Sequence, residues 1–339
     1  MVLDHHDLTM DGPDDGLPII RSINPAWSKI KSKVFTEGIT NKLYGYIDEG
    51  CSDKNEMILV RVYGNNTEII IDRDNEIKTH QRLHEKGFAT KVHCTINNGY
   101  FYGFVPGNIM STTTVCDAEI APLIAKEMAR MHCNVTLEDT APCIFPKLDK
   151  WLEQLPEEFT EPKFSKLAEV MSSKAAIVTE LRLIQSKAEA AQCPVVFCHN
   201  DILLANIIYN PDIKKISFID YEYGSPNYQG FDIGNHFNEY AGIETVDYNL
   251  YPDEKYQKWW LGIYLAERNA VKGLEKGSEA DLVKLYNETN FFALASHLFW
   301  GIWAVIQALN SDIDFDFMGY SGIRFGEYFK QKGKFIELV

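Results

Sequence analysis

Short runs of β-branched and aromatic residues dominate the first part of the chain. They predict strands over residues 33–36, 43–48, 57–63, 91–96 and 100–104. Asn97, Asn98 and Gly99 separate the last two runs and are typical of a hairpin turn. One helix interrupts the strands over residues 73–86, with Asp72 as its N-cap and Gly87 as its stop. The pattern therefore predicts a β-rich N-terminal lobe over residues 24–104.

Helical spacing of apolar residues takes over after residues 104–107, Phe-Val-Pro-Gly, which we interpret as a crossing between two lobes. Ile120 to Met131 begin the helical pattern, and residues 163–191, 254–272 and 279–309 continue it. Three short apolar runs at 195–198, 207–209 and 216–219 predict a small embedded sheet. We therefore expect an α+β fold with a mainly helical C-terminal lobe over residues 105–339 and a nucleotide cleft between the lobes.

The N-terminal residues 1–23 are rich in acidic and turn-forming residues, and we expect a disordered or loosely ordered lead. They contain no basic segment followed by an apolar one, so they do not resemble a signal peptide. The stretch 291–309 is almost long enough to span a bilayer. It carries Ser296, His297 and Gln307 and lacks flanking basic clusters, which favours a buried helix over membrane insertion.

Composition narrows the partners and the location. The net charge of −15 argues against nucleic acid and anionic membrane surfaces as main partners. The chain has seven cysteines and no C-x-x-C pair, which indicates reduced thiols in a reducing compartment. We therefore expect a cytoplasmic protein.

The most specific chemical pattern is H-N-D-x4-N at residues 199–206, followed by the strand end F-I-D at 218–220. The strand pattern allows Asp201, Asn206 and Asp220 to converge at one edge of the small sheet. Phosphoryl transfer from a Mg²⁺-nucleotide needs a carboxylate that takes the hydroxyl proton and oxygen ligands that hold the metal. Asp201 fits the first role, and Asn206 with Asp220 fits the second. The alternative is an Asx turn with a strand-end cap, but the joint spacing favours the kinase chemistry.

The N-terminal lobe offers groups for the nucleotide. Arg61 lies in the apolar run I-L-V-R-V-Y, where a buried charge needs a partner or a ligand, and Glu76 is the natural candidate. Alternation along the strand could instead point Arg61 to solvent. The turn around Gly38 can present backbone N–H groups to phosphate oxygens, although a plain hairpin turn is the better interpretation of this loop taken by itself.

These segments together resemble the choline/ethanolamine kinase family, which has a protein-kinase-like fold. The resemblance rests on F-T-E-G-I-T-N-K-L-Y, V-R-V-Y-G, H-N-D-x4-N-I-I-Y, F-I-D-Y-E-Y, F-D-I-G-N-H-F-N-E and F-W-G-I-W-A-V-I-Q, and it covers residue 24 to the C-terminus. The forms of the Gly38 loop and of F-D-I-G-N-H-F-N-E are more similar to ethanolamine kinases than to choline kinases. Arginine replaces the usual strand lysine of kinases, and H-N-D replaces H-R-D.

The resemblance implies a role for each matching position. Asp201 is the catalytic base and also meets the substrate, Asn206 and Asp220 hold Mg²⁺, and Glu76 supports Arg61 on the ATP phosphates. Nucleotide contacts are further implied for Gly38, Ile39, Thr40 and Asn41 over the phosphates, and for the backbone of Gly103, Phe104 and Val105 against adenine. Ammonium groups are held by carboxylates and aromatic faces, and the family positions that line such a pocket are Glu239, Trp300, Trp303 and Tyr320. Asp232 and His236 are expected to brace the site through hydrogen bonds.

The activity implied by the resemblance is ATP-dependent phosphorylation of ethanolamine to phosphoethanolamine, the first step of the CDP-ethanolamine route to phosphatidylethanolamine. Two other acceptors stay open: choline, as the sole or a second substrate, and an aminoglycoside. An inactive kinase-like binding module is the third alternative, against which the joint presence of Asp201, Asn206 and Asp220 argues. A homodimer is compatible with the family.

Overall fold

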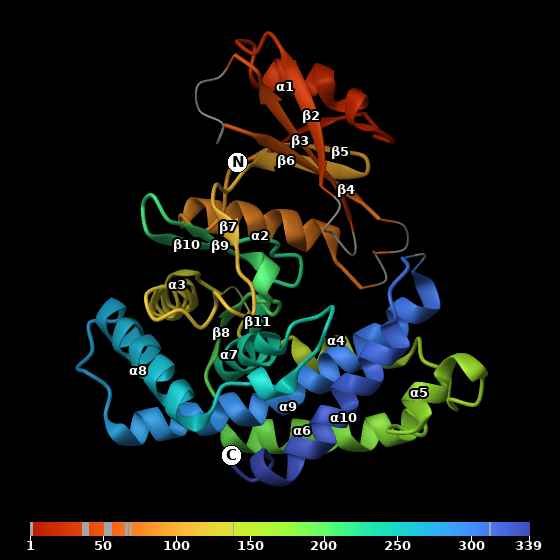
Figure 1. Ribbon diagram of the computed structural model, residues 1–339, viewed down its shortest axis with the longest axis vertical. Coiled ribbons are helices and arrows are strands. Elements are labelled where there is room, and N and C mark those ends of the chain that lie inside the picture. Colours follow the sequence, from red (N-terminus) through yellow and green to blue (C-terminus); the bar gives the residue numbers. More distant parts are fainter. Residues whose placement is uncertain are drawn as a thin grey trace. The chain divides into compact units, whose positions relative to one another are not determined.

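The structure is a computed structural model that describes residues 3–35, 41–50, 56–64, 67, 70–137, 139–311 and 313–339. The chain forms two compact units (Figure 1). The first unit contains Met1–Asn108 and Ser217–Glu222, and the second contains Ile109–Ile216 and Tyr223–Val339. The predicted boundary after residue 104 is thus close to the observed one, but the segment with Asp220 belongs to the first unit.

A six-stranded sheet in the order β1-β5-β6-β4-β3-β2 organises the first unit. Its strands are β1 (Asp4–His6), β2 (Ile30–Phe35), β3 (Asn41–Asp48), β4 (Ile58–Tyr63), β5 (Val92–Ile96) and β6 (Gly99–Gly103). All neighbouring strands are antiparallel except β1 and β5, which are parallel. The strands predicted from the apolar runs are therefore present.

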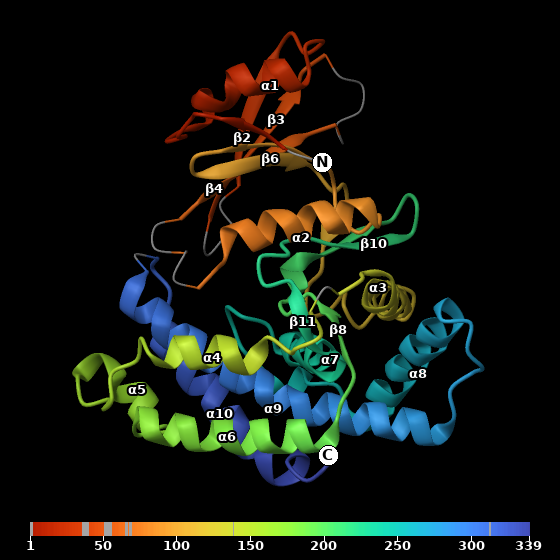
Figure 2. The same ribbon diagram turned by 180° about the vertical axis from the view of Figure 1, so that it is seen from behind.

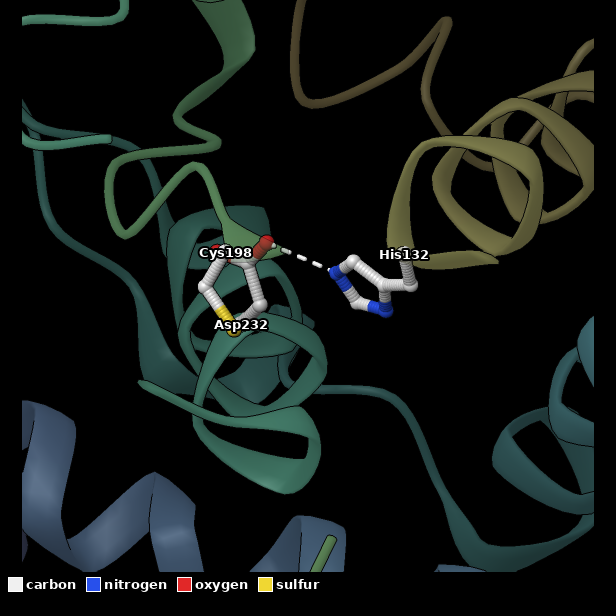
Figure 3. Close-up of side chains that lie close together, drawn as sticks. All are labelled: His132, Cys198 and Asp232. Atoms are coloured by element: carbon white, nitrogen blue, oxygen red, sulfur yellow. Dashed lines mark hydrogen bonds and ion pairs between the residues drawn. The ribbon is translucent and has the colours of Figure 1, made fainter. Parts of the chain in front are cut away.

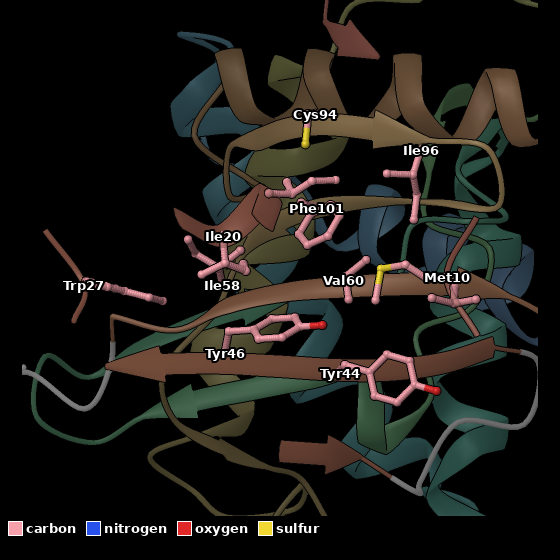
Figure 4. Close-up of a cluster of buried hydrophobic side chains, with 12 residues drawn as sticks. Met10, Ile20, Trp27, Tyr44, Tyr46, Ile58, Val60, Cys94, Ile96 and Phe101 are labelled. Atoms are coloured by element: carbon pink, nitrogen blue, oxygen red, sulfur yellow. The ribbon is translucent and has the colours of Figure 1, made fainter. Parts of the chain in front are cut away.

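The two faces of this sheet have different partners. Helices α1 (Leu17–Ile23) and α2 (Arg73–Glu85) lie over opposite faces (Figures 1 and 2). Ile58, Val60 and Val62 of β4 point into a core of buried apolar side chains (Figure 4). Because side chains alternate along a strand, Arg61 points to the other face, where α2 lies. Asp72 caps α2 as predicted, since its Oδ1 accepts the Asn75 N–H at 3.0 Å.

The N-terminal lead is ordered, contrary to expectation. Residues 3–23 form β1, a 3-10 turn (Pro13–Gly16) and α1. Met10 and Ile20 are 1% and 0% exposed in the core of Figure 4, and β1 extends the sheet beside β5. The acidic and turn-forming residues suggested a solvated tail, whereas a few apolar side chains among them suffice to bury the segment against the sheet.

Helices make up most of the second unit. They are α3 (Ala121–Asn134), α4 (Ile144–Leu152), α5 (Ser165–Ala168), α6 (Lys174–Ala191), α7 (Gln229–Asn238), α8 (Glu254–Val271), α9 (Glu279–Asn310) and α10 (Phe317–Phe335). The helix predicted over 163–191 is broken into α5 and α6, because Ser173 accepts the Ala176 N–H and starts a new helix. Strand β8 (Val195–Cys198) pairs with β11 (Ser225–Tyr228). Strand β9 (Ile207–Asn210) lies between β10 (Lys215–Phe218) and β7 (Asn108–Ile109), the strands in which the chain passes between the units. The three apolar runs predicted to form one small sheet therefore belong to two sheets, because β8 pairs with β11 and not with β9.

The central helix of the second unit is α9, which packs against α10 and α7 (Figures 1 and 2). It is long and apolar enough to cross a membrane by length and composition alone. However, 89% of its most apolar window is buried inside the protein, which agrees with the predicted buried helix.

Candidate active site

The loop between β8 and β9 carries the first two predicted catalytic residues. Asp201 and Asn206 are 8% and 7% exposed. The Asn206 amide donates from Nδ2 to the backbone oxygen of Asp201 at 2.9 Å and to Asp201 Oδ2 at 3.1 Å. These two hydrogen bonds orient the amide, so that its carbonyl oxygen is the atom available to a hard metal ion. The two residues predicted to be the base and an oxygen ligand are therefore hydrogen-bonded to each other within one loop.

Asp232 of α7 fixes the start of this loop. Its carboxylate accepts the backbone N–H of His199 at 2.9 Å and of Asn200 at 2.7 Å. It also pairs with His132 Nε2 at 3.0 Å, while His132 Nδ1 lies 2.7 Å from the Tyr264 hydroxyl. Burial raises the pKa of Asp232, but the hydrogen bonds and charges of these partners outweigh burial and lower it overall. The predicted bracing role of Asp232 is confirmed by these contacts.

Hydrogen bonds also fix the backbone around Asn200 and Ile202. Asn200 has a φ of 68°, a left-handed conformation that asparagine tolerates better than most residues. Its Nδ2 donates to the Tyr223 carbonyl at 2.9 Å, and its Oδ1 accepts from Asn227 at 2.8 Å. His236 Nδ1 lies 3.3 Å from the Ile202 carbonyl. The loop that carries Asp201 is therefore anchored on both sides of the catalytic position.

His132, Cys198 and Asp232 form a buried group whose side-chain ligand atoms lie within 4.8 Å of one another (Figure 3). Hydrogen bonds account for this group. The Cys198 thiol donates to the carbonyls of Asn227 and Tyr228 at 3.5 Å each, and burial raises its pKa well above the ordinary value. A metal would need the thiolate, and Asp232 is already engaged by three N–H groups. The cluster is a structural support for the loop.

A second buried charge cluster lies in the first unit around Arg61. Its guanidinium meets Glu76 at 3.0 Å, Asp220 at 2.6 Å and Glu222 at 3.0 Å. The predicted pair of Arg61 and Glu76 is confirmed. The alternative that Arg61 points to solvent is wrong, because Arg61 is only 7% exposed. Three carboxylates around one guanidinium explain how a charge is tolerated in the middle of an apolar strand.

Arg73 extends this cluster. It meets Glu76 at 2.8 Å and Glu222 at 3.6 Å, and its guanidinium also donates to Asn41 Oδ1 at 3.1 Å. Asn41 in turn donates from Nδ2 to Glu222 at 3.0 Å. Asn41, predicted to contact phosphate, thus takes part in a side-chain network at the start of β3. Gly38, Ile39 and Thr40 lie outside the described residues.

Glu222, like Arg73, is a member of this cluster that was not predicted from the sequence. It lies two residues after Asp220 in F-I-D-Y-E-Y, and this closeness to a predicted site residue is the signal that could have found it. Burial, followed by the charge of Asp220, raises the pKa of Glu222 to about 7, against the attraction of Arg61 and Arg73. Asp220 itself has a φ of 64°, a strained conformation that often marks functional positions.

The predicted adenine segment continues β6. Gly103 donates its N–H to the Lys91 carbonyl at 3.1 Å, and Phe104 donates to the Met57 carbonyl at 3.1 Å. The Gly103 carbonyl accepts from the Thr90 hydroxyl at 2.7 Å. Residues just before β4 and β5 therefore bind these three backbone groups and fix the backbone that leads to Val105.

The four residues predicted to line the amine pocket are all buried, with exposures between 3% and 8%. The rings of Trp300 and Trp303 lie 5.4 Å apart at 76°. Glu239, just beyond α7, meets Arg324 of α10 at 2.9 Å, and the same guanidinium nitrogen lies 3.1 Å from the Tyr320 hydroxyl. The structure therefore joins Glu239 to Tyr320 and Trp300 to Trp303, all within the second unit.

The profile of the choline/ethanolamine kinase family matches residues 33–329 of the chain. The chain belongs to this family. It is 41% identical to a probable ethanolamine kinase of Nematostella vectensis over 342 residues, covering 98% of this chain and 97% of that protein. It is 40% identical to ethanolamine kinase 1 of Mus musculus, covering 94% of this chain and 89% of that protein.

Solved structures agree with this family membership. An ethanolamine kinase of Plasmodium vivax matches with a TM-score of 0.80 at 25% identity, over 94% of this chain and 89% of that one. A choline kinase of Cryptosporidium parvum shares the fold, with a TM-score of 0.78 at 24% identity over 96% and 97%. The predicted family, the kinase-like α+β fold and the enzyme class are thereby confirmed.

Arg324 is a further residue that was not predicted from the sequence. It is 1% exposed and lies one helical turn after Tyr320. The signal was available: Arg324 lies among the aromatic residues Tyr320, Phe325 and Tyr328, and an arginine in such a segment needs an anion if it is buried. The pattern did not identify which anion.

Proposed function

We infer that the chain transfers the γ-phosphoryl group of ATP to the hydroxyl of ethanolamine and forms phosphoethanolamine. The observation that carries this inference is the identity of about 40% to ethanolamine kinases along almost the whole chain. The buried carboxylate of Glu239, which Arg324 joins to the hydroxyl of Tyr320, supports it, because an ammonium group is attracted by carboxylates and aromatic rings.

In the proposed reaction, Asp201 accepts the proton of the substrate hydroxyl as the oxygen attacks the γ-phosphorus. Asn206 fixes the orientation of Asp201 through its two hydrogen bonds. Asp232 keeps the loop in place through the backbone of His199 and Asn200. Most of the rate enhancement in phosphoryl transfer comes from such positioning and from charge stabilisation.

The proposed cofactor is Mg²⁺-ATP. The donor set suits Mg²⁺, since Asn206 offers an amide oxygen and Asp220 a carboxylate, and this ion prefers oxygen ligands. When bound, the metal offsets the charge that develops on the phosphate oxygens. Arg61 holds Asp220 by an ion pair of 2.6 Å, so we propose that Arg61 serves both this carboxylate and the phosphates. The loop of Gly38, Ile39, Thr40 and Asn41 is proposed to cover the phosphates.

The remaining proposed contacts concern adenine and the amine. The backbone at Gly103, Phe104 and Val105 is proposed to meet adenine. Glu239 is proposed to take the ammonium, with Trp300, Trp303 and Tyr320 as aromatic walls.

A cytoplasmic location is also proposed. Its support is that the six cysteines that the structure describes are free thiols. Homodimerisation is proposed on family grounds alone.

Choline is the second candidate acceptor, and the paired rings of Trp300 and Trp303 favour it, because aromatic faces also bind trimethylammonium groups. Initial rates with ethanolamine, its mono- and dimethyl forms and choline separate the two. We expect kcat/KM to fall with each added methyl group. A higher kcat/KM for choline than for ethanolamine would identify choline as the main substrate.

Asp201→Ala tests the kinase chemistry in the same assay, with the exposed turn variant Asp212→Ala as its control. Turnover should be lost in the first variant and retained in the second. Nucleotide binding, measured by calorimetry, should survive in both. Substantial turnover by Asp201→Ala would refute the assignment of the base.

A further inference from the structure

One arginine side chain connects most of the proposed amine pocket. Arg324 reaches from α10 into the interior of the second unit and is 1% exposed. Its guanidinium donates to Glu239 Oε1 at 2.9 Å, to the Tyr320 hydroxyl at 3.1 Å and to Ser296 Oγ at 2.8 Å. A buried guanidinium is costly unless its donors are used, and its planar fork holds its acceptors in fixed directions.

Ser296 connects Arg324 to helix α7 and, through Asn235, to Trp300. Its hydroxyl accepts from Arg324 and from Asn238 Nδ2 at 3.1 Å, and donates to Asn235 Oδ1 at 2.7 Å. A serine hydroxyl has one donor and two acceptor positions, and all three are engaged. Asn235 Oδ1 also accepts from Trp300 Nε1 at 2.7 Å. Three of the four proposed pocket residues therefore depend on one network: Glu239, Tyr320 and Trp300.

Glu239 forms an ion pair with Arg324, and the groups around this pair are uncharged or paired elsewhere. Burial raises the pKa of Glu239, and the charge and hydrogen bond of Arg324 lower it without cancelling the rise. Burial also raises the pKa of Tyr248 and Tyr320 and lowers that of His297, so these three neighbours are neutral near pH 7. The nearby Glu327 pairs with Lys330 at 3.1 Å.

We propose that Arg324 is a positioning residue for the amine substrate, which holds Glu239 as an anion in one orientation so that it accepts a hydrogen bond from a primary ammonium. This deepens the proposed function and rests on it. Choline has no N–H to donate, so its binding depends less on the direction in which the carboxylate points. A site built to hydrogen-bond one group discriminates strongly against an analogue that lacks it. Arg324 is therefore expected to contribute to the preference for ethanolamine.

Arg324→Met is the main test, because methionine fills much of the same space without charge or donors. Arg324→Lys keeps the charge without the fork. Lys330→Met, on the same helix with a side chain that is 68% exposed, is the matched control. KM and kcat are measured for ethanolamine, choline and ATP from pH 6 to 8, with circular dichroism as the check on folding.

We expect Arg324→Met to raise KM for ethanolamine about tenfold or more, the size of one lost ionic hydrogen bond. KM for ATP should be unchanged, and KM for choline should rise less. The rise for ethanolamine should be steeper at pH 6 than at pH 8, since a carboxyl without its guanidinium partner binds a proton more readily. Arg324→Lys should bring the pH dependence of KM back toward that of the wild type but restore only part of the affinity.

Equal losses for both amines, a parallel rise in KM for ATP, or an effect independent of pH would overturn the proposal and indicate a merely structural arginine. If Arg324→Met does not fold, Arg324→Lys decides, because unchanged selectivity in that variant contradicts the role of the fork. A wild-type enzyme that phosphorylates neither amine would refute the proposed function itself, and the inference with it. An active wild type with an indifferent Arg324 refutes the inference alone.

Discussion

The hydrogen bonds of Asp232 predict that the catalytic loop depends on one buried carboxylate. Asp232→Asn is the sharpest perturbation, because it keeps the shape of the side chain and removes its charge. One oxygen remains as an acceptor for Asn200 N–H. In the wild type, Asp232 Oδ2 accepts hydrogen bonds from His199 N at 2.9 Å and from His132 Nε2 at 3.0 Å. In the variant, an NH₂ group takes the place of this oxygen and faces these two donors.

The size of the effect follows from these contacts. Two hydrogen bonds to a charged acceptor are lost, each with a net contribution of about 1.5–3 kcal/mol. The His199 N–H is left buried without its partner, which adds to the loss. We therefore expect the free energy of unfolding of the second unit to fall by about 3–6 kcal/mol, a large share of the ~5–15 kcal/mol typical of a protein.

Guanidinium chloride unfolding followed by tryptophan fluorescence measures this loss. Five of the six tryptophans, all but Trp27, belong to the second unit, so the signal reports mainly on that unit. The control is Asp253→Asn, in which an exposed N-cap that accepts the Tyr256 N–H at 2.8 Å becomes an equally good cap. Its stability should stay within about 0.5 kcal/mol of the wild type.

Turnover should fall with stability in the Asp232 variant, because Asp201 follows directly on the two residues that Asp232 holds. Small displacements of a catalytic group can cost about a hundredfold in rate. A loss of under about 1 kcal/mol, together with kcat near that of the wild type, would show that other contacts position the loop and would refute the reasoning.

Three further predictions concern other contacts. In the folded protein the pKa of Glu222 is raised to about 7, so the folded state binds its proton more tightly than the unfolded state and the wild type loses stability as the pH rises toward 7. Glu222→Gln should therefore gain stability relative to the wild type between pH 5 and 8, by up to about 3 kcal/mol; a constant difference in urea unfolding would contradict this. Asp220→Ala should abolish the Mg²⁺-dependent part of ATP binding in calorimetry, and an unchanged Mg²⁺ effect would remove Asp220 from the metal site. Gly234→Ala should destabilise the enzyme by more than about 1 kcal/mol, since its Cβ would lie 2.5 Å from the Thr289 carbonyl of α9, whereas Gly326→Ala in open space should gain about 0.5–1 kcal/mol in thermal unfolding.

Local patterns carried the prediction of the catalytic loop and of most strands. The apolar runs at 195–198, 207–209 and 216–219 form β8, β9 and β10, and the polar residues between them lie in the loop where the pattern put them. This succeeded because a buried strand and its flanking loop depend on neighbours in sequence.

The partners of buried charges could not be predicted in the same way. Arg61 pairs with Glu76, as expected, but it also pairs with Glu222, which is 161 positions away in the sequence. Arg324 found Glu239 at a separation of 85. A buried arginine in the sequence indicates that an anion lies nearby, but the identity of that anion depends on how elements distant in sequence fold together. The assignment of Ser217–Glu222 to the first unit was missed for the same reason, since Arg61 ties Asp220 and Glu222 to β4.

Helix α7 contacts both the loop that carries Asp201 and the network of the proposed amine pocket. All ten of its residues are buried, although half of them are polar or charged. Asp232 and His236, four positions apart and so on one face, contact the backbone of the loop that carries Asp201. Asn235 and Asn238, three apart on a second face, hold the network of Ser296 and Trp300. One helix therefore contacts both the loop of the proposed base and the network of the proposed ammonium pocket. If these proposals hold, α7 fixes the separation that a two-carbon amino alcohol has to span, and four of its five polar residues are buried because they contact one of these two parts.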